Sequence, residues 1–188
     1  GECVLRFDDT NPKKAELQYY DAFRDALKWL GIHVDREMIL SSHMQDFYSY
    51  AKEMIEKERA FVCFCDKETV GAYREKAMIC DHRKQSARKN LTFWQEMLDK
   101  KYKEGECILR LTGEIDSANA VMRDPILFRI VDYPHPLTKE KYSVWPMYDF
   151  ATVVAEKLSG VSHILRSNEF GSMRIELQNY IREILDFP

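Results

Sequence analysis

Four side chains of the types that bind zinc occur in two closely spaced pairs. Cys63 and Cys65 are separated by one residue, and Cys80 and His82 are separated in the same way. Thiolate sulfur and imidazole nitrogen suit zinc better than magnesium or calcium, and four protein ligands leave no position open for water. The spacing therefore predicts a structural zinc site. The alternative is that Cys63 and Cys65 alternate on a strand and the other pair lies nearby by chance.

The remaining cysteines, Cys3 and Cys107, lie within apolar, strand-like segments. A cysteine in such a segment is usually a small buried hydrophobe rather than a nucleophile. We expect both thiols to be buried and unreactive. The total of five cysteines is odd, which argues against a framework of disulfides.

Charged side chains stand at the ends of two expected strands. Asp8 and Asp9 directly follow the apolar residues 3–7, at the edge where α/β sheets bind ligands, and a carboxylate there can hold an ammonium group. Arg166 follows a second short apolar segment and offers a planar fork that matches a carboxylate. Each has an ordinary structural explanation as well: a helix entry for the aspartates, a surface ion pair for Arg166, and a core position for Tyr148.

A basic stretch between residues 67 and 103 interleaves lysine and arginine with aromatic side chains. This composition fits a surface that contacts nucleic acid phosphates. It fits a solvated helix surface at least as well. The basic residues are Lys67, Arg74, Lys76, Arg83, Lys84, Arg88, Lys89, Lys100, Lys101 and Lys103.

The composition is that of a folded, soluble protein. Of the 188 residues, 45% are hydrophobic, 12% are aromatic and 31% are charged, with a formal net charge of -3. These values exclude a disordered chain, and the net charge means that any contact with RNA must be local. No apolar run approaches the roughly 20 residues that cross a bilayer. Residues 1–20 also lack a secretory pattern, so we expect a cytoplasmic protein without membrane contact.

Apolar periodicity places the first candidate residues on a βα unit. Residues 3–7 alternate as a strand, and residues 15–30 present an apolar helical face that ends at Gly31. A second helix is expected from Ser42, which forms a capping-box pattern with Gln45.

The pattern changes in the middle of the chain and then returns. Residues 61–143 combine the clustered cysteines, a basic helix and short strands near residues 108–111 and 127–131. After Pro146 we expect a helix at residues 148–158, a short strand at 162–165 and a final helix to about 185.

This order predicts an α/β fold class. We expect a Rossmann-type parallel-sheet domain in two parts, residues 1–60 and 144–188, interrupted by an inserted α+β domain at residues 61–143.

Several segments together resemble the catalytic region of the glutamyl-tRNA and glutaminyl-tRNA synthetases, and the glutamyl enzymes of the archaeal and eukaryotic type above all. These are class I aminoacyl-tRNA synthetases, and the resemblance spans nearly the whole chain. In order, the segments are Leu5-Arg6-Phe7-Asp8-Asp9-Thr10-Asn11-Pro12, Trp29-Leu30-Gly31, Met122-Arg123-Asp124-Pro125, Tyr133-Pro134-His135-Pro136, Tyr148-Asp149-Phe150-Ala151 and residues 160–167.

The resemblance implies a Rossmann-type catalytic domain interrupted by an insertion that binds the tRNA acceptor stem, with a zinc site of the kind that bacterial relatives commonly carry. It favours glutamate as the substrate, because Arg166 matches the arginine that pairs with the γ-carboxylate in the glutamyl branch. By the same comparison Asp8 holds the α-amino group and Tyr148 lines the pocket. Thr152, one helical turn later, stands where bacterial members often have Asn and is assigned to the same pocket.

The implied activity is that of a glutamate–tRNA ligase, which activates glutamate with ATP and Mg²⁺ and transfers it to the 3′ end of tRNA. The HIGH-type and KMSKS-type signatures that hold ATP are absent. No catalytic residue is therefore assigned, and we expect this chain alone to be an inactive fragment. Residues 169–173 depart from the usual continuation of the family.

Two kinds of alternative remain open. One is an enzyme of different specificity, either a glutaminyl-tRNA synthetase or a glutamyl-transferring tRNA-modifying paralogue with a similar zinc-bearing insert. Arg166 argues against the first, and the segments Asp9-Thr10-Asn11-Pro12 and Pro134-His135-Pro136 argue against the second. The other kind is a zinc-stapled tRNA-binding module without turnover.

Overall fold

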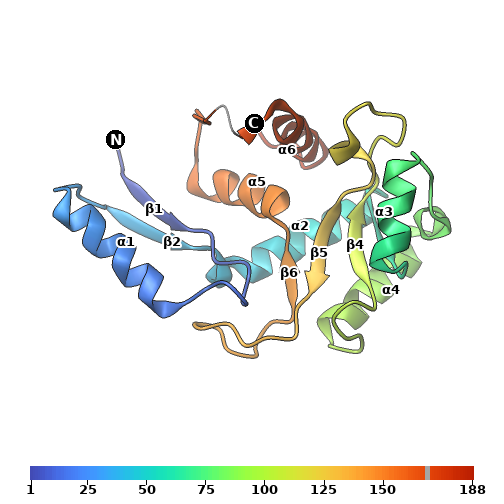
Figure 1. The fold of residues 1–188 in the computed structure, drawn as a ribbon, viewed down its shortest axis with the longest axis horizontal. Coiled ribbons are helices and arrows are strands. Elements are labelled where there is room, and N and C mark those ends of the chain that lie inside the picture. Colours follow the sequence, from blue (N-terminus) through green and yellow to red (C-terminus); the bar gives the residue numbers. More distant parts are fainter. Residues whose placement is uncertain (168–169) are drawn as a thin grey trace.

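The computed structural model describes residues 1–167 and 170–188, whose strands form two separate sheets (Figure 1). The first sheet is a parallel pair, β1 (Val4–Phe7) and β2 (Arg36–Ile39), connected by α1 (Leu17–Trp29). The second sheet is antiparallel, with its strands in chain order. It contains β3 (Ala60–Cys63), β4 (Ile108–Leu111), β5 (Ile126–Ile130) and β6 (Val144–Pro146). The fold is therefore of the mixed α/β class that the sequence predicts.

The β1–α1–β2 unit forms one end of an elongated molecule, while the antiparallel sheet occupies the other half (Figure 1). Helices α5 and α6 lie along one side, between these two parts. The helices after α1 are α2 (Met44–Glu56), α3 (Lys67–Glu75), α4 (Ala87–Leu98), α5 (Tyr148–Ser159) and α6 (Ser172–Ile184). Short 3-10 turns occupy Leu40–His43, Asp81–Lys84 and Ala120–Met122.

The main core forms where α2, α4 and α5 meet the antiparallel sheet. Phe47 of α2, Phe128 of β5 and Phe150 of α5 are fully buried, and the ring centroids of Phe128 and Phe150 are 5.0 Å apart. Trp94 of α4 packs on the same Phe128 ring. Burying each large apolar side chain contributes about 1.5–3 kcal/mol. This packing fixes α5, whose first turn and inner face carry the expected pocket residues.

Helix α1 is amphipathic as expected, but most of its apolar face is uncovered. Tyr20 is buried against Phe7, whereas Leu17, Phe23 and Leu30 are more than half exposed. A two-stranded sheet is narrower than the wide apolar stripe of a core helix, so it covers only the residues directly above it.

Two expected local features are wrong. Residues 162–165 form no strand, because no strand within the described residues runs beside them to pair with. The capping box is also absent: Ser42 lies inside a 3-10 turn, and α2 begins at Met44 with no side-chain cap.

The two isolated cysteines differ in burial. Cys107 is buried, as expected, but Cys3 is exposed, because the strand it precedes lies at the edge of the narrow parallel sheet. Of the departing segment 169–173, Glu169 lies outside the described residues, and α6 begins at Ser172 after Gly171. No helix in the described part of the chain is both long and apolar enough to cross a membrane.

Candidate amino-acid pocket and metal centre

The two cysteine and histidine pairs come together in space. The ligand atoms of Cys63, Cys65, Cys80 and His82 all lie within 4.8 Å of one another. Cys63 Sγ is 3.8 Å from both Cys80 Sγ and His82 Nδ1, and Cys65 Sγ is 3.5 Å from His82 Nδ1. Four donors at such distances surround a single point.

The spacing of these donors fits a tetrahedral zinc ion. Zinc–sulfur bonds of 2.3 Å and zinc–nitrogen bonds near 2.0 Å give tetrahedral edges of about 3.8 Å between sulfurs and about 3.6 Å between sulfur and nitrogen. The observed separations match the first value and lie close to the second. The donor set therefore suits a closed structural site with no position for a substrate.

Local structure explains why the pairs meet. Cys63 ends the buried strand β3, and Asp66 caps α3 by accepting a hydrogen bond from the Thr69 N–H at 2.7 Å. Helix α3 then returns the chain so that Cys80 and His82 reach the end of β3. The pKa of the Cys63 thiol lies below its ordinary value, chiefly because of its contact with the Cys80 thiol.

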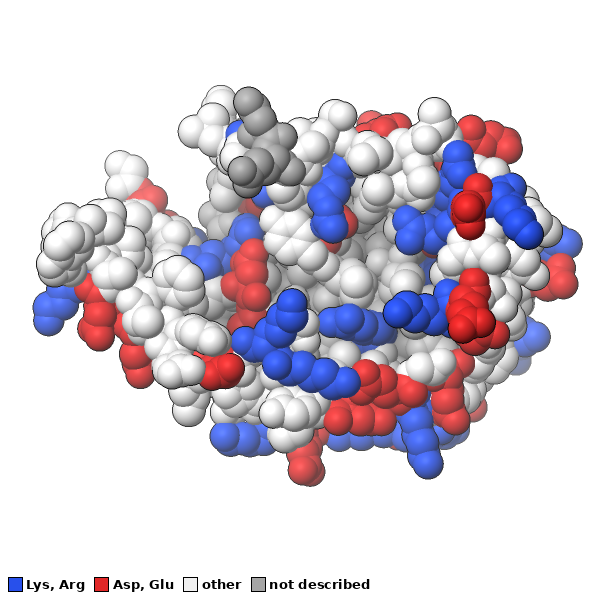
Figure 2. Space-filling model, viewed as in Figure 1, with Lys and Arg blue, Asp and Glu red and all other residues white. Residues whose placement is uncertain are grey.

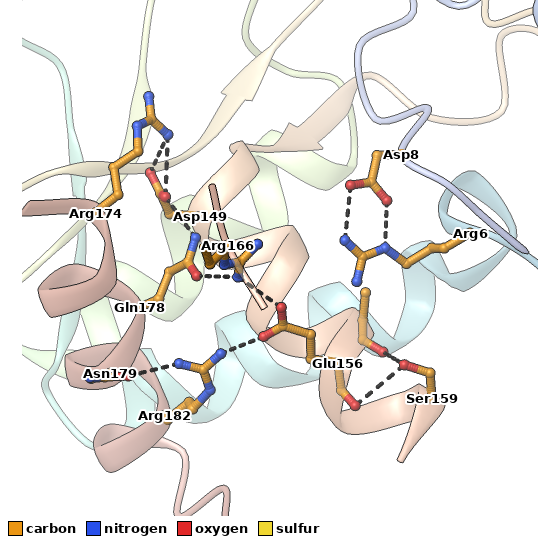
Figure 3. A network of polar contacts seen from close by, with 11 residues as sticks. Arg6, Asp8, Asp149, Glu156, Ser159, Arg166, Arg174, Gln178, Asn179 and Arg182 are labelled. Carbon is orange, nitrogen blue, oxygen red and sulfur yellow. Dashed lines mark hydrogen bonds and ion pairs between the residues drawn. The ribbon is translucent and has the colours of Figure 1, made fainter. Parts of the chain in front are cut away.

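The second candidate site lies between α5, α6 and β1, and its centre is the buried carboxylate of Glu156 (Figure 3). Arg166 Nη2 donates to Glu156 Oε1 at 2.8 Å and to Gln178 Oε1 at 2.8 Å. Arg182 from α6 donates to the other Glu156 oxygen. The Arg166 guanidinium also stacks on the Phe170 ring, 4.3 Å from its centroid. The arginine expected to bind a carboxylate is thus held by carboxylate and amide groups of the protein.

Gln178 connects this network to the start of α5. Its Nε2 donates to Asp149 Oδ1 at 3.0 Å, and Arg174 pairs with the same aspartate at 3.0 Å. Tyr148, the expected pocket residue, is 40% exposed and lies between Phe170 and Arg174. Its ring is therefore available on the surface rather than buried in the core.

The two aspartates after β1 have different environments. Asp8 is exposed, and Arg6 holds its carboxylate through two hydrogen bonds of 2.7 and 3.1 Å (Figure 3). Asp9 is buried and accepts hydrogen bonds from Tyr20 Oη and from the N–H and hydroxyl of Ser41. Asp8 can therefore face a ligand, while Asp9 anchors the turn.

His135 secures this turn from the opposite side. It is fully buried, stacks on Trp145, and has Nε2 2.9 Å from the Asp9 carbonyl oxygen. Its Nδ1 accepts from the Leu137 and Thr138 N–H groups, so Nε2 carries the proton and donates to Asp9. Burial lowers the pKa of His135 and favours this neutral form.

The structure brings most of the expected pocket residues to one region but not into direct contact. Arg6, whose guanidinium is hydrogen-bonded to Asp8, lines a groove of about 680 Å³ together with Ser159 and residues 160–163. This groove lies next to the Glu156 network (Figure 3). Thr152 is fully buried, and its hydroxyl has no hydrogen-bond partner within residues 1–167 and 170–188. It lies beneath the region rather than on its surface.

Sequence reasoning did not single out Glu156, Gln178 or Arg110. Two of them had a visible signal: Glu156 continues the helical stripe of Tyr148 and Thr152, and Arg110 interrupts an apolar strand. A charged residue inside an apolar pattern indicates a buried polar network. Nothing comparable distinguishes Gln178 on α6.

Several cations of the basic stretch already have partners in the protein. Arg83 pairs with the buried Asp124, and Arg74 and Lys100 donate to backbone carbonyls. Lysine and arginine side chains also form a row across the lower middle of the face shown in Figure 2, with acidic side chains beside and below it.

The chain combines a parallel βα unit with an antiparallel sheet, and its sequence matches the catalytic domain of class I aminoacyl-tRNA synthetases. The chain belongs to the family of class I tRNA synthetases for glutamate and glutamine: the family model "tRNA synthetases class I (E and Q), catalytic domain" matches residues 1–187.

The chain is similar to curated proteins from archaea. It is 40% identical to the "Glutamate--tRNA ligase" of Korarchaeum cryptofilum over 96% of its own length and 34% of that protein. It is 38% identical to the "Glutamate--tRNA ligase" of Pyrobaculum islandicum, again over 96% of the chain and 33% of the relative. The chain spans about a third of the length of the curated relatives it matches.

Solved structures share the fold. A glutamate tRNA ligase from Elizabethkingia meningosepticum, crystallised in complex with its amino acid, superposes over the whole chain and 41% of that protein, with a TM-score of 0.65 and 16% identity. The glutamate-tRNA synthetase of Elizabethkingia anophelis gives the same TM-score and identity over 42% of its length.

Proposed function

We propose that the protein is a glutamate–tRNA ligase and that this chain supplies its amino-acid pocket and acceptor-stem surface. The observation that carries the proposal is the extent of the likeness: relatives called glutamate–tRNA ligase match 96% of the chain, and the family model matches residues 1–187. The reaction would join glutamate to ATP as an adenylate and pass the glutamyl group to the 3′ end of tRNA.

Arg166 is the residue we assign to the γ-carboxylate of glutamate. Its hydrogen bonds within the described residues all use Nη2, which Glu156 and Gln178 hold in place. Nη1 and Nε form no hydrogen bond within the described residues, so either group can donate to a substrate carboxylate while Nη2 stays on Glu156 and Gln178. Neutral glutamine would give up that charged pair, so the arrangement favours glutamate.

Asp8, Tyr148 and Thr152 complete the proposed pocket. The exposed Asp8 carboxylate would bind the α-ammonium group of glutamate while it keeps its hydrogen bonds to Arg6. Tyr148 would cover the aliphatic part of the substrate with its exposed ring. Thr152 would act from below, since its buried hydroxyl faces the same helix side as Tyr148 and Glu156.

We assign residues 61–143 to an insertion that binds the acceptor stem, and residues 1–60 and 144–188 to the catalytic domain. Strands β4 and β5 lie within the insertion, β3 begins one residue before it, and β6 follows it and leads back into α5. The row of basic side chains across the middle of the face in Figure 2 suits the phosphates of an RNA helix.

Zinc would be held by Cys63, Cys65, Cys80 and His82 and would fasten the end of β3 to the turn after α3. When bound, it supplies structural cross-linking and no reactive position. ATP and Mg²⁺ would bind the parts of the enzyme that match the rest of the relatives' length. A protein that charges tRNA works where translation occurs, so we infer a cytoplasmic location.

Amino-acid activation tests the proposal directly. Glutamate-dependent exchange of pyrophosphate into ATP, followed by charging of tRNA, would be measured on the complete gene product that includes this chain. We expect exchange with glutamate and little with glutamine. Preference for glutamine would favour a glutaminyl enzyme, and tRNA binding without exchange would favour a non-catalytic module; either result would refute the proposal.

A further inference from the structure

Arg110 is an unusual buried cation. It lies on β4, is only 1% exposed, and forms no salt bridge with a carboxylate in the parts of the chain that the structure describes. A guanidinium removed from water is stable only where an opposite charge and hydrogen-bond acceptors replace the solvent. The question is which group provides that charge.

The Asp124 carboxylate lies near Arg110 but forms no hydrogen bond with it; its two hydrogen bonds use Oδ1, and Oδ2 has no partner within the described residues. Arg110 Nε donates to the backbone carbonyl of Asp124 at 2.9 Å, while the Asp124 carboxylate pairs with Arg83 at 2.9 Å and accepts from the Gly113 N–H. The backbone at Gly113 passes so close to Met122 that a Cβ would lie 2.0 Å from the Met122 carbonyl oxygen. This tight packing fixes the Asp124 loop, to which Arg110 is bound through Nε.

The remaining contacts of Arg110 lead to sulfur. Its Nη1 is 3.8 Å from Cys63 Sγ and 3.7 Å from Cys80 Sγ. A register shift between Leu109 and Arg110, where β4 pairs with β5, sets the direction of this side chain. The guanidinium also lies over the Phe61 ring, 5.5 Å from its centroid.

We propose that Arg110 is the charge-compensating partner of a zinc–thiolate centre formed by Cys63, Cys65, Cys80 and His82. Three thiolates and a neutral imidazole leave a zinc centre with one net negative charge. That charge lies where a buried arginine needs it, and the hydrogen bonds from Nη1 fall on two of the coordinating sulfurs. This inference rests on the zinc site proposed above and adds a residue that positions and stabilises its ligands.

The test is zinc affinity in the whole chain, measured by competition with a chromophoric chelator. Arg110→Met, which keeps the apolar stem but not the charge, should weaken zinc binding by about 10- to 100-fold. Arg110→Lys should restore much of the affinity, because it returns a cation to the same place. Arg129→Met is the matched control, because Arg129 is a half-buried arginine on the neighbouring strand β5. The zinc affinity of this variant should stay within about threefold of the wild-type value.

Two further measurements separate this role from general packing. Zinc should raise the melting temperature less in Arg110→Met than in the wild type, while without metal the variant should unfold no earlier, because an uncompensated buried cation is gone. In the cobalt-substituted chain the thiolate-to-metal charge-transfer band should move to longer wavelength when the cation is absent, and Arg110→Lys should reverse the shift.

The outcomes are distinguishable. If the wild type binds zinc and Arg110→Met binds it equally well, or if Arg129→Met loses as much affinity, the role of Arg110 is refuted and the metal site stands. A wild-type chain that binds no zinc when freshly reduced overturns the metal site and the role of Arg110 together.

Discussion

The two candidate sites each contain an arginine that is shielded from water, and they satisfy its charge in opposite ways. Arg166 is held by Glu156, a carboxylate of the protein itself, and Arg182 shares the same partner. Arg110 meets two cysteine sulfurs and no carboxylate within the described residues. In the first site a carboxylate faces the arginine as soon as the protein folds, although Arg166 and Arg182 share it, whereas in the second site the proposed metal would make the sulfurs anionic.

This difference indicates how each region uses its ligand. The proposed pocket around Arg166 would exist before the amino acid arrives, with Nη2 of the guanidinium held in advance, so binding would cost little ordering. The proposed zinc site beside Arg110 would couple metal binding to the folding of the antiparallel sheet. Changes to the metal should therefore affect stability strongly, and changes to the amino acid should not.

Removal of zinc should have the largest effect on stability. Chelation, or the double variant Cys63→Ser with Cys80→Ser, should lower the free energy of unfolding by about 4 kcal/mol relative to protein in zinc about a thousandfold above its Kd. Denaturant unfolding with and without metal measures this, and elemental analysis gives the zinc content. A chain equally stable in both conditions would contradict the coupling of metal to fold.

Loss of the Glu156 charge should have the next largest effect. Glu156→Gln leaves Arg166 and Arg182 without their shared carboxylate and should cost about 3 kcal/mol in the free energy of unfolding. The cost should be the same with and without zinc, because the network belongs to the other region. Glu183→Gln, at an exposed position on α6, serves as the control and should change stability by less than about 0.5 kcal/mol. An equal effect of both substitutions would mean that Glu156 is not the centre of the network.

Acid should weaken the turn that carries Asp8. The pKa of His135 is lowered by burial, so below its ordinary value of about 6.5 the unfolded chain takes up a proton that the folded chain refuses. The free energy of unfolding therefore keeps its full value above that pH and falls as the pH decreases. His135 contributes a slope of at most about 1.4 kcal/mol per pH unit. The Asp9 carboxylate, 3.4 Å from His135 Nε2, raises the pKa of His135 and so opposes the effect of burial, whereas Lys139 lowers it further.

Unfolding midpoints between pH 5 and pH 8 check this expectation. His135→Gln should be less stable than the wild type at pH 7.5 and should show a flatter pH profile, whereas His33→Gln, at an exposed position, should keep the wild-type profile. If stability depends on pH in His135→Gln as steeply as in the wild type, then His135 is not the cause of the pH dependence.

The smallest effect is expected at an ion pair that links the two halves of the molecule. Lys13, in the turn after β1, pairs with Glu104, which precedes β4, at 2.6 Å. Both side chains are well exposed, so Lys13→Met should cost about 0.2–1 kcal/mol and less in high salt. Denaturant unfolding at low and high ionic strength measures it. A larger loss of stability would mean that the parallel βα unit and the antiparallel sheet stabilise each other more than one exposed ion pair explains.

The sequence revealed what is local and missed what the fold assembles. Cys63, Cys65, Cys80 and His82 were found because their spacing is a property of neighbouring residues, and the structure gathers them. Glu156, Gln178 and Arg110 were missed because their partners are brought together only by packing. The expected strand at residues 162–165 failed for the same reason, since a strand requires a neighbour that its own sequence does not specify.

Amino-acid specificity at Arg166 tests the central proposal most directly. In ATP–pyrophosphate exchange by the complete gene product, Arg166→Gln should lower kcat/KM for glutamate by about 100-fold, the loss expected for a hydrogen-bonded pair of opposite charges, and should lower it much less for glutamine. Arg24→Gln, which removes a guanidinium paired with Glu37 of the protein, is the control and should leave both values nearly unchanged. If Arg166→Gln activates glutamate as well as the wild type does, then Arg166 does not recognise the substrate carboxylate and the proposed pocket is wrong.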